Sequence, residues 1–350
     1  MNAPADLIRL TQFSHGGGCG CKIAPAVLSE ILAKTPIRGL PKDLLVGIES
    51  SDDAAVYRLN DEQAIVATTD FFTPIVDDPT DFGRIAATNA LSDVYAMGGK
   101  PIFALAIVGM PLDKMPVEVI QRIIAGGESV CAQAGIPIAG GHSIDTLEPI
   151  YGLVALGLVH PKKVKRNDRA KDGDVLILGK PLGVGILSAA LKKGRLSAEG
   201  YKKMVEITTQ LNTPGAALAE MEDVHALTDV TGFGLAGHLL EICRGSKLGA
   251  EIRFDDLPVI PEALEHVKEG TATGASDRNW KGYGHEVRMA AGAPEWKKNL
   301  ITDPQTSGGL LVACASTAEK RVVEEFTRRG LGPARRIGVM RLGTPQLAII

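Results

Sequence analysis

The sequence lacks several features that define common classes of protein. Aromatic residues make up only 4% of its 350 residues, and no apolar run approaches the length of a membrane span. The net charge of −3 gives no basic field of the kind that attracts nucleic acid. The first ten residues have no apolar core like that of a secretion signal. These absences predict a cytoplasmic protein that binds neither nucleic acid nor membranes.

Cysteine is also scarce, and the five cysteines form two kinds. Cys19 and Cys21 lie one residue apart in His-Gly-Gly-Gly-Cys-Gly-Cys-Lys, residues 15–22, here called the nose. Glycine-rich backbone is permissive and has little to pack, so we expect the nose to be mobile and Cys19 to be exposed. The other three lie in apolar contexts and are predicted to be buried, inert thiols: Cys131, Cys243 and Cys314.

The pattern of apolar residues predicts a mixed α/β (α+β) fold. Short β-rich runs alternate with longer helical patterns, and the chain is long enough for two domains. Residues 160–174 are polar with no apolar period, which predicts a solvated connection between the domains. The expected division is a flexible, glycine-rich N-terminal segment over residues 1–22, which ends in the nose, an N-terminal domain over 23–160 and a C-terminal α/β domain over 172–350.

Individual elements follow from local signals. A helix is expected from about Asp81 to Met97, because Pro79-Thr80 suit a helix start and Gly98-Gly99 suit a stop. Residues 270–295 are rich in glycine, alanine and polar residues and are predicted to form a long loop. Strands are expected near residues 44–49, 64–70, 101–108 and 151–159.

Acidic residues recur at the ends of the predicted elements. The pair Asp52-Asp53 is one such site, and Asp93 is another, four residues after Asn89 on one face of the predicted helix. A single Asp after a strand is ordinary turn chemistry, but five such sites favour a converging set. Carboxylates that lie close together repel unless a cation joins them, and Mg²⁺ takes such ligands together with phosphate oxygens. Three more sites follow apolar runs that end in Thr-Asp: Asp70, Asp229 and Asp303.

Glycine-bearing segments support the interpretation as a metal–phosphate site. Gly141-His142-Ser143 is predicted to be a turn, residues 231–237 open a helix whose free N–H groups suit an anion, and residues 307–309 follow Asp303. The lysine-bearing P-loop is absent, and no segment completes a dinucleotide-binding fingerprint. The predicted site is therefore assembled from several segments.

The chain from about residue 9 to its end resembles the selenophosphate synthetase family. The segments that carry the resemblance, in consistent order, are HGGGCGCK, DDAAVY, TTDFFTPIVD, ATNALSDVYAMGGKP, AGGHSID, TDVTGFGLAGH and DPQTSGGLL. The wider superfamily contains aminoimidazole ribonucleotide synthetase, thiamine-monophosphate kinase and a hydrogenase-maturation ATPase. Those relatives share acidic ATP-site patterns but not the Cys-Gly-Cys-Lys segment.

This resemblance implies a two-domain aminoimidazole ribonucleotide synthetase-like fold and a homodimer, with an intersubunit β-barrel formed by the N-terminal domains. It implies that ATP binds with several Mg²⁺ ions, and that ATP, selenide and water give selenophosphate, AMP and phosphate. Selenophosphate would supply activated selenium for selenocysteine and selenium-modified tRNA. Whether free selenide or a protein delivers the selenium, and whether K⁺ is required, stay open at this point.

The resemblance also implies roles for particular residues. Cys19 aligns with the family's catalytic cysteine and Lys22 with its essential lysine, which also contacts the nucleotide. The Mg²⁺ ligands would be Asp53, Asp93 and Asp229. The family usually carries Thr-Arg or a similar pair where this chain has Ser50-Ser51. The nucleotide-binding positions would be Ser50, Ser51, Asp52, Asp70, Asp93, Gly141, His142 and Ser143.

Alternatives to this function stay open on the sequence. The nose would also fit a redox pair, or half of a zinc site with His15, and Cys21 has no assigned role. A nearby ammonium favours a reactive thiolate, which Lys22 would supply to Cys19. Other functions are a related kinase or ATP-dependent synthase with a different small substrate, and a non-catalytic thiol-based carrier of selenium or sulfur. The nucleotide product separates them: AMP, ADP or none.

Overall fold

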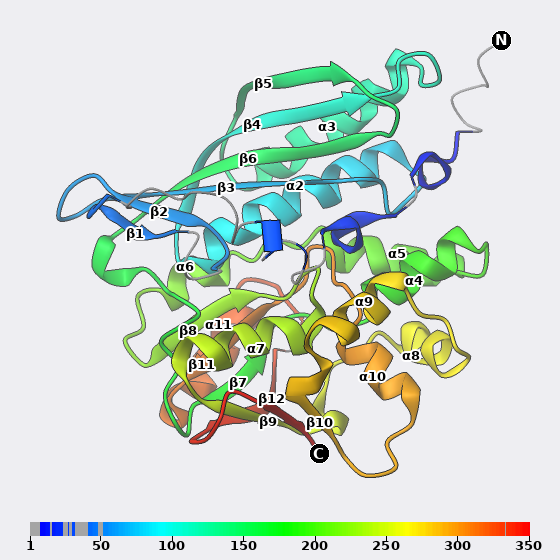
Figure 1. Cartoon of the computed structure of the whole chain (residues 1–350). Coiled ribbons are helices and arrows are strands. Elements are labelled where there is room, and N and C mark those ends of the chain that lie inside the picture. Colours follow the sequence, from blue (N-terminus) through cyan, green and yellow to red (C-terminus); the bar gives the residue numbers. More distant parts are fainter. Residues whose placement is uncertain are drawn as a thin grey trace.

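The structure, a computed structural model, has two β-sheets, one in each half of the chain (Figure 1). It describes residues 8–14, 16–23, 27, 30–31, 41–47, 52–332 and 334–350. The N-terminal sheet has the strand order β1-β2-β3-β6-β4-β5. Its strands are β1 Leu44–Val46, β2 Ala55–Arg58, β3 Ala64–Phe72, β4 Lys100–Met110, β5 Ile138–Asp145 and β6 Ile150–Val159.

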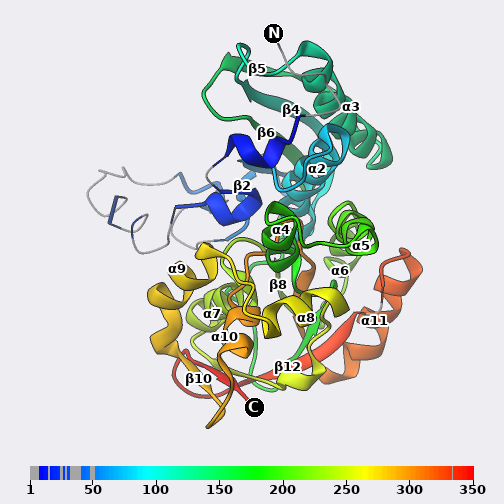
Figure 2. The ribbon, with the colours of Figure 1, turned by 90° about the vertical axis from the view of Figure 1, so that its right-hand side faces the viewer.

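Two helices, α2 (Pro79–Ala96) and α3 (Val117–Gln133), lie on the same side of the N-terminal sheet (Figure 2). The helix predicted from Asp81 to Met97 is confirmed as α2. The Asp78 carboxylate accepts a hydrogen bond from the N–H of Asp81 at 2.9 Å, and Pro79 occupies the first turn. Gly98, at φ +78°, ends the helix in the left-handed region.

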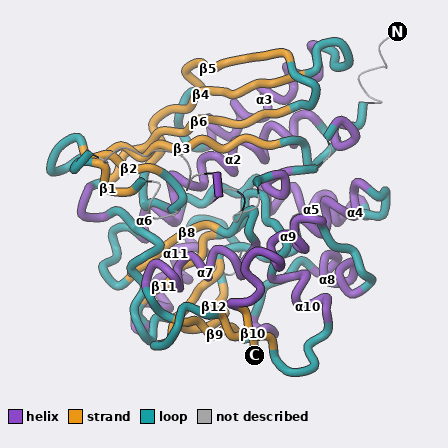
Figure 3. The backbone as a smooth tube through the Cα atoms, viewed as in Figure 1, coloured by secondary structure: helices purple, strands orange, loops and turns teal. Residues whose placement is uncertain are grey.

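The C-terminal half has a seven-stranded sheet in the order β10-β13-β9-β12-β7-β11-β8. Figure 3 shows its strands surrounded by helices. The strands are β7 Val175–Leu178, β8 Val224–Asp229, β9 Gly249–Ile252, β10 Val287–Met289, β11 Leu310–Cys314, β12 Arg335–Arg341 and β13 Leu347–Ile349. The helices are α4 Val184–Lys192, α5 Ala198–Thr208, α6 Pro214–Leu218, α7 Gly234–Ser246, α8 Pro261–Lys268, α9 Gly274–Tyr283, α10 Glu295–Ile301 and α11 Glu319–Arg328.

The long loop predicted over residues 270–295 is wrong. Helix α9, a 3₁₀ turn at Gly284–Glu286 and strand β10 occupy most of that segment. The Thr273 hydroxyl caps α9 by accepting a hydrogen bond from the N–H of Ser276 at 3.1 Å. Inside α9, the buried Asn279 donates to the carbonyls of Gly232 and Thr302, both at 3.0 Å. These tertiary contacts hold a helix whose own residues are poor helix formers.

The connection between the two halves, predicted to be solvated, is packed in part: it contains both exposed residues and buried polar residues. Lys165 is buried, and its ammonium donates to the carbonyls of Met221 and Val224 at 2.8 and 2.6 Å. The N–H of Asn167 donates to the carboxylate of Asp52 at 3.3 Å. The polar residues of this segment therefore have partners in both halves of the chain. The domain boundaries given above stay predictions.

Two further expectations are tested by burial and helix length. Cys131, Cys243 and Cys314 are all fully buried, as predicted. None of the helices in the described part of the chain is both long enough and apolar enough to pass through a lipid bilayer.

Candidate active site

Four carboxylates from four separate segments meet between the two halves of the molecule. Asp53 lies just before β2, Asp70 near the end of β3, Asp93 on α2, and Asp229 at the end of β8. The charges of Asp70 and Asp229 both raise the pKa of Asp93, and those of Asp93 and Asp229 raise the pKa of Asp53. The convergence predicted from the sequence is therefore present for these four residues.

Hydroxyl groups fix the orientation of three of the carboxylates. Thr228 donates to Asp53 at 2.8 Å, and Thr68 donates to Asp93 at 2.5 Å. Ser92 donates to Asp229. Sequence reasoning did not assign a role to these hydroxyls, although each lies next to or near an Asp in a Thr-Asp or Ser-Asp pair. That pairing is the signal by which they are recognisable.

Burial and mutual repulsion make this cluster costly when all its members are ionised. Burial is the main cause that raises the pKa of Asp53 and Asp93 well above the ordinary Asp range, with the charges of neighbouring carboxylates next. Burial also raises the pKa of Asp229, although Ser92, His238 and Lys22 lower it in part. One carboxylate oxygen of Asp53, Oδ2, is buried with no hydrogen-bond partner. Burial also raises the pKa of Asp52 to about 7. Buried oxygens of this kind fit a hard cation.

Within the described residues, no group of three or more His, Cys, Asp and Glu side chains is arranged to hold a metal ion by itself. A cation bound here would need further oxygen ligands from outside the protein, such as those of phosphate or water.

A chain of hydrogen bonds joins the nose to the carboxylate cluster. The Lys22 ammonium lies 3.3 Å from Asp70 Oδ2. Asn89 Nδ2 donates to the same oxygen at 2.7 Å, and Asn89 Oδ1 accepts from the Cys19 thiol at 3.3 Å. The Asp70 charge is the main cause that raises the pKa of Lys22. One buried amide on α2 therefore positions both of the reactive residues predicted on the nose.

The expectation that Cys19 is exposed is wrong, and the expected mobility of the nose stays a prediction. Its side chain is 1% exposed. The N–H of Cys19 donates to the Thr306 hydroxyl at 3.1 Å, and the N–H of Gly18 donates to the Thr73 carbonyl at 2.8 Å. The nose thus lies between the two halves of the molecule (Figure 2), held by contacts within its own chain.

The thiolate expected from the Lys22 charge is also not favoured in this arrangement. Burial, followed by the charge of Asp70, raises the pKa of Cys19 well above its ordinary value, and Lys22 lowers it only in part. In the absence of further cations, Cys19 is a neutral thiol that donates to Asn89. A change in the charge of the cluster is therefore needed to favour the thiolate.

Asp303, the third Thr-Asp residue, does not join the cluster. Its carboxylate accepts from the N–H of Ile186 at 3.2 Å, in the first turn of α4, and from Gln305 Nε2 at 2.9 Å. The Gln305 side-chain oxygen in turn accepts from the N–H groups of Gly183 and Val184. Asp303 therefore has a structural role: it fixes the segment that carries Thr306 against the start of α4.

Asp303→Asn is expected to make the stability of the protein less dependent on pH. Burial raises the pKa of Asp303 to about 8. The folded state thus binds this proton more tightly than the unfolded chain, so its contribution is complete below about pH 4 and is lost as the pH rises to 8. The slope of the free energy of unfolding against pH should differ between the wild type and Asp303→Asn by at most about 1.4 kcal/mol per pH unit. Urea unfolding at pH 5 and pH 8 measures how much the free energy of unfolding changes in each protein. An equal change in the wild type and in Asp303→Asn would contradict the assignment. Asp255→Asn, at a side chain 94% exposed, is the matched control.

The predicted turn at Gly141-His142-Ser143 is part of strand β5 instead. All three residues are exposed, on the edge of the N-terminal sheet. Gly141 has φ +154°, and a Cβ there would lie 2.1 Å from the Ala106 carbonyl of β4, so glycine is required at this irregular pairing. The nucleotide-binding role of the three residues stays a prediction. Ser50, Ser51 and His15 lie outside the described residues.

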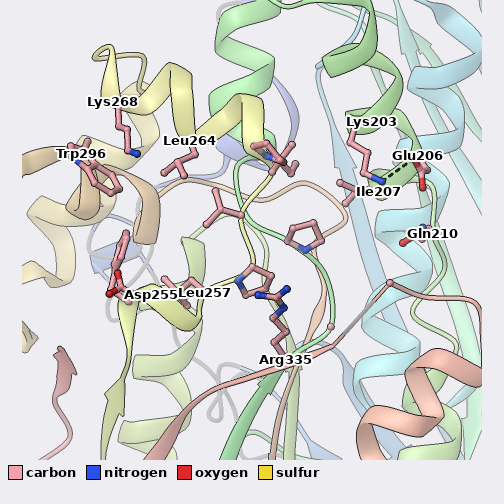
Figure 4. Close-up of a pocket in the computed structure, with 18 of the residues that line it drawn as sticks. Lys203, Glu206, Ile207, Gln210, Asp255, Leu257, Leu264, Lys268, Trp296 and Arg335 are labelled. Atoms are coloured by element: carbon pink, nitrogen blue, oxygen red, sulfur yellow. Dashed lines mark hydrogen bonds and ion pairs between the residues drawn. The ribbon is translucent and has the colours of Figure 1, made fainter.

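A large cleft of about 680 Å³ lies elsewhere, in the C-terminal half (Figure 4). Apolar side chains such as Leu257, Leu264 and Trp296 form much of its wall, and Lys203 pairs with Glu206 at its rim at 3.1 Å. None of the four converging carboxylates lines it. The candidate site is accordingly defined by its chemistry and not by the size of a cavity.

Lys180 is a buried cation behind the site that sequence reasoning missed. Its ammonium donates to the carbonyls of Gln210 and Ser307 at 2.6 and 2.8 Å, and burial lowers its pKa to about 7. The N–H of Ser307 donates to Asn89 Oδ1 at 2.7 Å, so Lys180 supports the loop that supports Asn89. No signal in the sequence marks this residue, because its partners are distant main-chain carbonyls.

Comparison with known proteins matches this fold to one class. Residues 51–159 match the N-terminal domain of AIR synthase related proteins, and residues 171–344 match the C-terminal domain. A solved structure, the thiamine-monophosphate kinase from Stenotrophomonas maltophilia K279a, is 22% identical with a TM-score of 0.64, and the match covers 94% of this chain and 96% of that one. The chain is therefore an AIR synthase-related protein.

Closer relatives define the family within that class. The selenide, water dikinase of Dechloromonas aromatica (strain RCB) is 62% identical over 99% of this chain and 100% of its own length. That of Burkholderia pseudomallei (strain K96243) is 64% identical over 97% of this chain and 96% of its own. The chain belongs to the selenide, water dikinase family.

Proposed function

We propose that this protein makes selenophosphate from selenide and ATP, with release of AMP and phosphate. The observation that carries the proposal is the array Cys19–Asn89–Asp70–Lys22, which places a thiol and an ammonium beside a buried carboxylate cluster. Identity above 60% to selenide, water dikinases over nearly the whole chain supports the same activity. A site with many carboxylates and no obvious acid–base pair suits phosphoryl transfer, which mainly requires positioning and neutralisation of charge.

Asp53, Asp93 and Asp229 are proposed to hold Mg²⁺ ions that bind together with ATP. The unpartnered Asp53 Oδ2 and the mutual repulsion of the three carboxylates support this assignment. Bound Mg²⁺ would neutralise phosphate charge and polarise the phosphoryl groups. Asp52 and Asp70 flank these residues and are proposed to orient the nucleotide, as are Ser50, Ser51 and the segment Gly141-His142-Ser143.

Lys22, Asn89 and the nose have separate proposed roles in the reaction. Lys22, whose side chain is 40% exposed beside Asp70, is proposed to contact a phosphate group that enters the cluster. Asn89 fixes the positions of Asp70 and Cys19 at once. The closed nose keeps Cys19 away from solvent, which favours attack on the γ-phosphorus by selenide over attack by water. Water must reach the β-phosphoryl group of ADP in the second step, so the nose has to open or shift between the steps.

The N-terminal sheet supports the proposal of a homodimer. Helices α2 and α3 lie on one side of it (Figure 2), whereas Tyr57, Phe71 and Ile144 are 42%, 46% and 51% exposed. Strand β5, at the sheet edge, has unpaired main-chain groups along one side. A second copy that pairs along this edge would cover Ile144 and bring Gly141-His142-Ser143 close to a site in the dimer.

Ile144→Lys is expected to shift the protein from dimer to monomer and to lower its activity with it. A lysine at the centre of the proposed interface would place an unpaired charge against an apolar surface. Sedimentation velocity measures the change in mass, and circular dichroism verifies the fold. Val117→Lys, at a residue 60% exposed on α3, is the control. A dimeric Ile144→Lys protein would contradict this use of β5.

The proposed activity is tested by ³¹P NMR of ATP with and without selenide under anaerobic, reducing conditions. Selenophosphate, AMP and orthophosphate should form together, and only when selenide is present. ADP as the final product would support a related kinase instead. No turnover of ATP would support a thiol-based carrier.

A further inference from the structure

A second, smaller pocket also borders the nose, and none of the four carboxylates of the cluster lines it. It has a volume of about 280 Å³ and borders the glycine backbone at Gly16, Gly17 and Gly20. Among the described residues, three cations line it and no acidic residue does. The residues around the nose that complete this pocket include Thr306, Pro304 and Ile75, and the cations are Lys192, Lys193 and Arg278.

In the part of the chain that the structure describes, no carboxylate forms an ion pair with any of the three cations. The Lys192 ammonium donates to the Ser14 carbonyl at 2.9 Å, and Arg278 donates to the Gly20 carbonyl at 2.8 Å. The Lys193 side chain makes no hydrogen bond or ion pair with the described residues, and its main-chain N–H donates within α4 to the Ala189 carbonyl. Neutral carbonyls orient two of these side chains without cancelling their charge. The pocket therefore carries a positive potential.

Two carboxylates lie close behind the lining, and both are already engaged. Asp77 accepts from the Thr11 hydroxyl at 2.7 Å and pairs with Arg9 at 3.0 Å. Asp303 accepts from α4 and from Gln305, as described above. Neither residue lines the pocket, so an anion inside it would meet cations first.

The carboxylate cluster has the reverse charge. Asp53, Asp70, Asp93 and Asp229 all lie there, and Lys22 is the only cation that contacts one of them among the described residues. Hydrogenselenide, the form of selenide in neutral water, is a small anion that this cluster would repel. Once Mg²⁺ and ATP occupied the cluster, the nucleotide would also obstruct that approach.

We propose that the basic pocket, here called the anion port, is the binding site through which hydrogenselenide reaches Cys19. The inference rests on the proposed function, because it names the route of that reaction's substrate. Water occupies about 30 Å³ per molecule in the liquid, so the port has room for a small anion with part of its hydration shell. Each of the three cations contributes attraction that falls as the ionic strength rises.

Only a thin wall separates the anion port from Cys19. It consists of glycine backbone and of Thr306, whose hydroxyl accepts from the Cys19 N–H at 3.1 Å. Gly18 has φ +55°, and a Cβ there would lie 2.3 Å from both the Thr306 hydroxyl and Ile75. The absence of side chains at the glycines lets a small backbone rotation open the wall. The anion would then meet Cys19 without crossing the carboxylate cluster.

Lys193 is the residue to change, since it holds no part of the nose. In Lys193→Glu, the KM for selenide is expected to rise about tenfold at low ionic strength, with kcat and the KM for Mg-ATP within about twofold of wild type. Added KCl should reduce the difference. Lys193→Gln should lie between the two proteins. Lys202→Glu, which makes the same charge change at an exposed residue that does not line the port, is the control.

A second measurement does not depend on turnover. Iodoacetate and iodoacetamide alkylate thiols at similar sites but differ in charge, and peptide mass spectrometry reports the rate at Cys19 for each. The ratio of the iodoacetate rate to the iodoacetamide rate should fall about tenfold in Lys193→Glu and stay unchanged in Lys202→Glu. An unchanged ratio together with an unchanged KM for selenide would overturn the anion port. Failure of wild-type protein to form AMP with selenide would instead overturn the proposed function, and the alkylation ratio would still test whether anions enter here.

Discussion

Cys19→Ser is expected to lower selenide-dependent formation of AMP by at least about a hundredfold while leaving the fold intact. Serine keeps a hydroxyl that can donate to Asn89 Oδ1, as the thiol does at 3.3 Å, so the packing of the nose should survive. What is lost is the soft sulfur, which suits selenium far better than a hard hydroxyl does. Initial rates with saturating Mg-ATP and selenide measure the effect, and the melting temperature verifies the fold.

Cys21→Ser is the matched control for this change. Cys21→Ser makes the same exchange of sulfur for oxygen two residues away from Cys19. The Cys21 side chain is only half-buried, and none of the described hydrogen bonds links it to Asn89. The Cys21→Ser protein should keep at least half of the wild-type activity. Normal turnover by Cys19→Ser would remove any reactive role for the thiol. Equal losses in the two variants would point to a disulfide or to a shared effect on the nose.

Asp229→Asn is expected to weaken the binding of Mg-ATP by about a hundredfold, equivalent to about 2.7 kcal/mol. The loss follows from the removal of one charged ligand from a site that must hold dications and phosphates together. Asparagine keeps the size of the side chain and can still accept from Ser92, which donates to Asp229 in the wild type. Isothermal titration calorimetry of Mg²⁺ with a non-hydrolysable ATP analogue measures the change.

The same substitution should stabilise the metal-free protein. Burial raises the pKa of Asp229, so its ionised form is costly to bury, and its charge is the largest of the carboxylate charges that raise the pKa of Asp53 and Asp93. Loss of that charge should raise the melting temperature without Mg²⁺ by about 2–4 °C. Wild-type affinity for Mg-ATP in Asp229→Asn would exclude this residue from the metal site. The exposed turn residue Asp61, changed to Asn, controls for the loss of one negative charge.

A gain in stability combined with a loss of affinity would separate two explanations for the carboxylates. Residues that served the fold alone would lose stability when changed. Residues that exist to bind cations should show the opposite sign, because the folded protein accepts unfavourable repulsion in order to keep the ligands in place. Asp303 provides the contrast within this chain, since its carboxylate receives hydrogen bonds from α4 and from Gln305.

The sequence by itself determined the elements whose signals are local. Helix α2 follows from Asp78 and Pro79 at one end and Gly98 at the other, and the long apolar runs became β3, β4 and β6. The ordered set of short motifs also determined the family, because each motif is a local string. Such signals depend on residues a few positions apart, where backbone preference and capping act.

Only the tertiary structure decided which similar motifs act together. Asp70, Asp229 and Asp303 all follow Thr at the end of an apolar run, yet only the first two join the cluster, since Asp303 meets the start of α4 instead. The burial of Cys19 depends on Asn89, 70 positions away, and on Thr306, 287 positions away. Desolvation and charge repulsion are set by neighbours in space, and a linear pattern of residue types does not contain those distances.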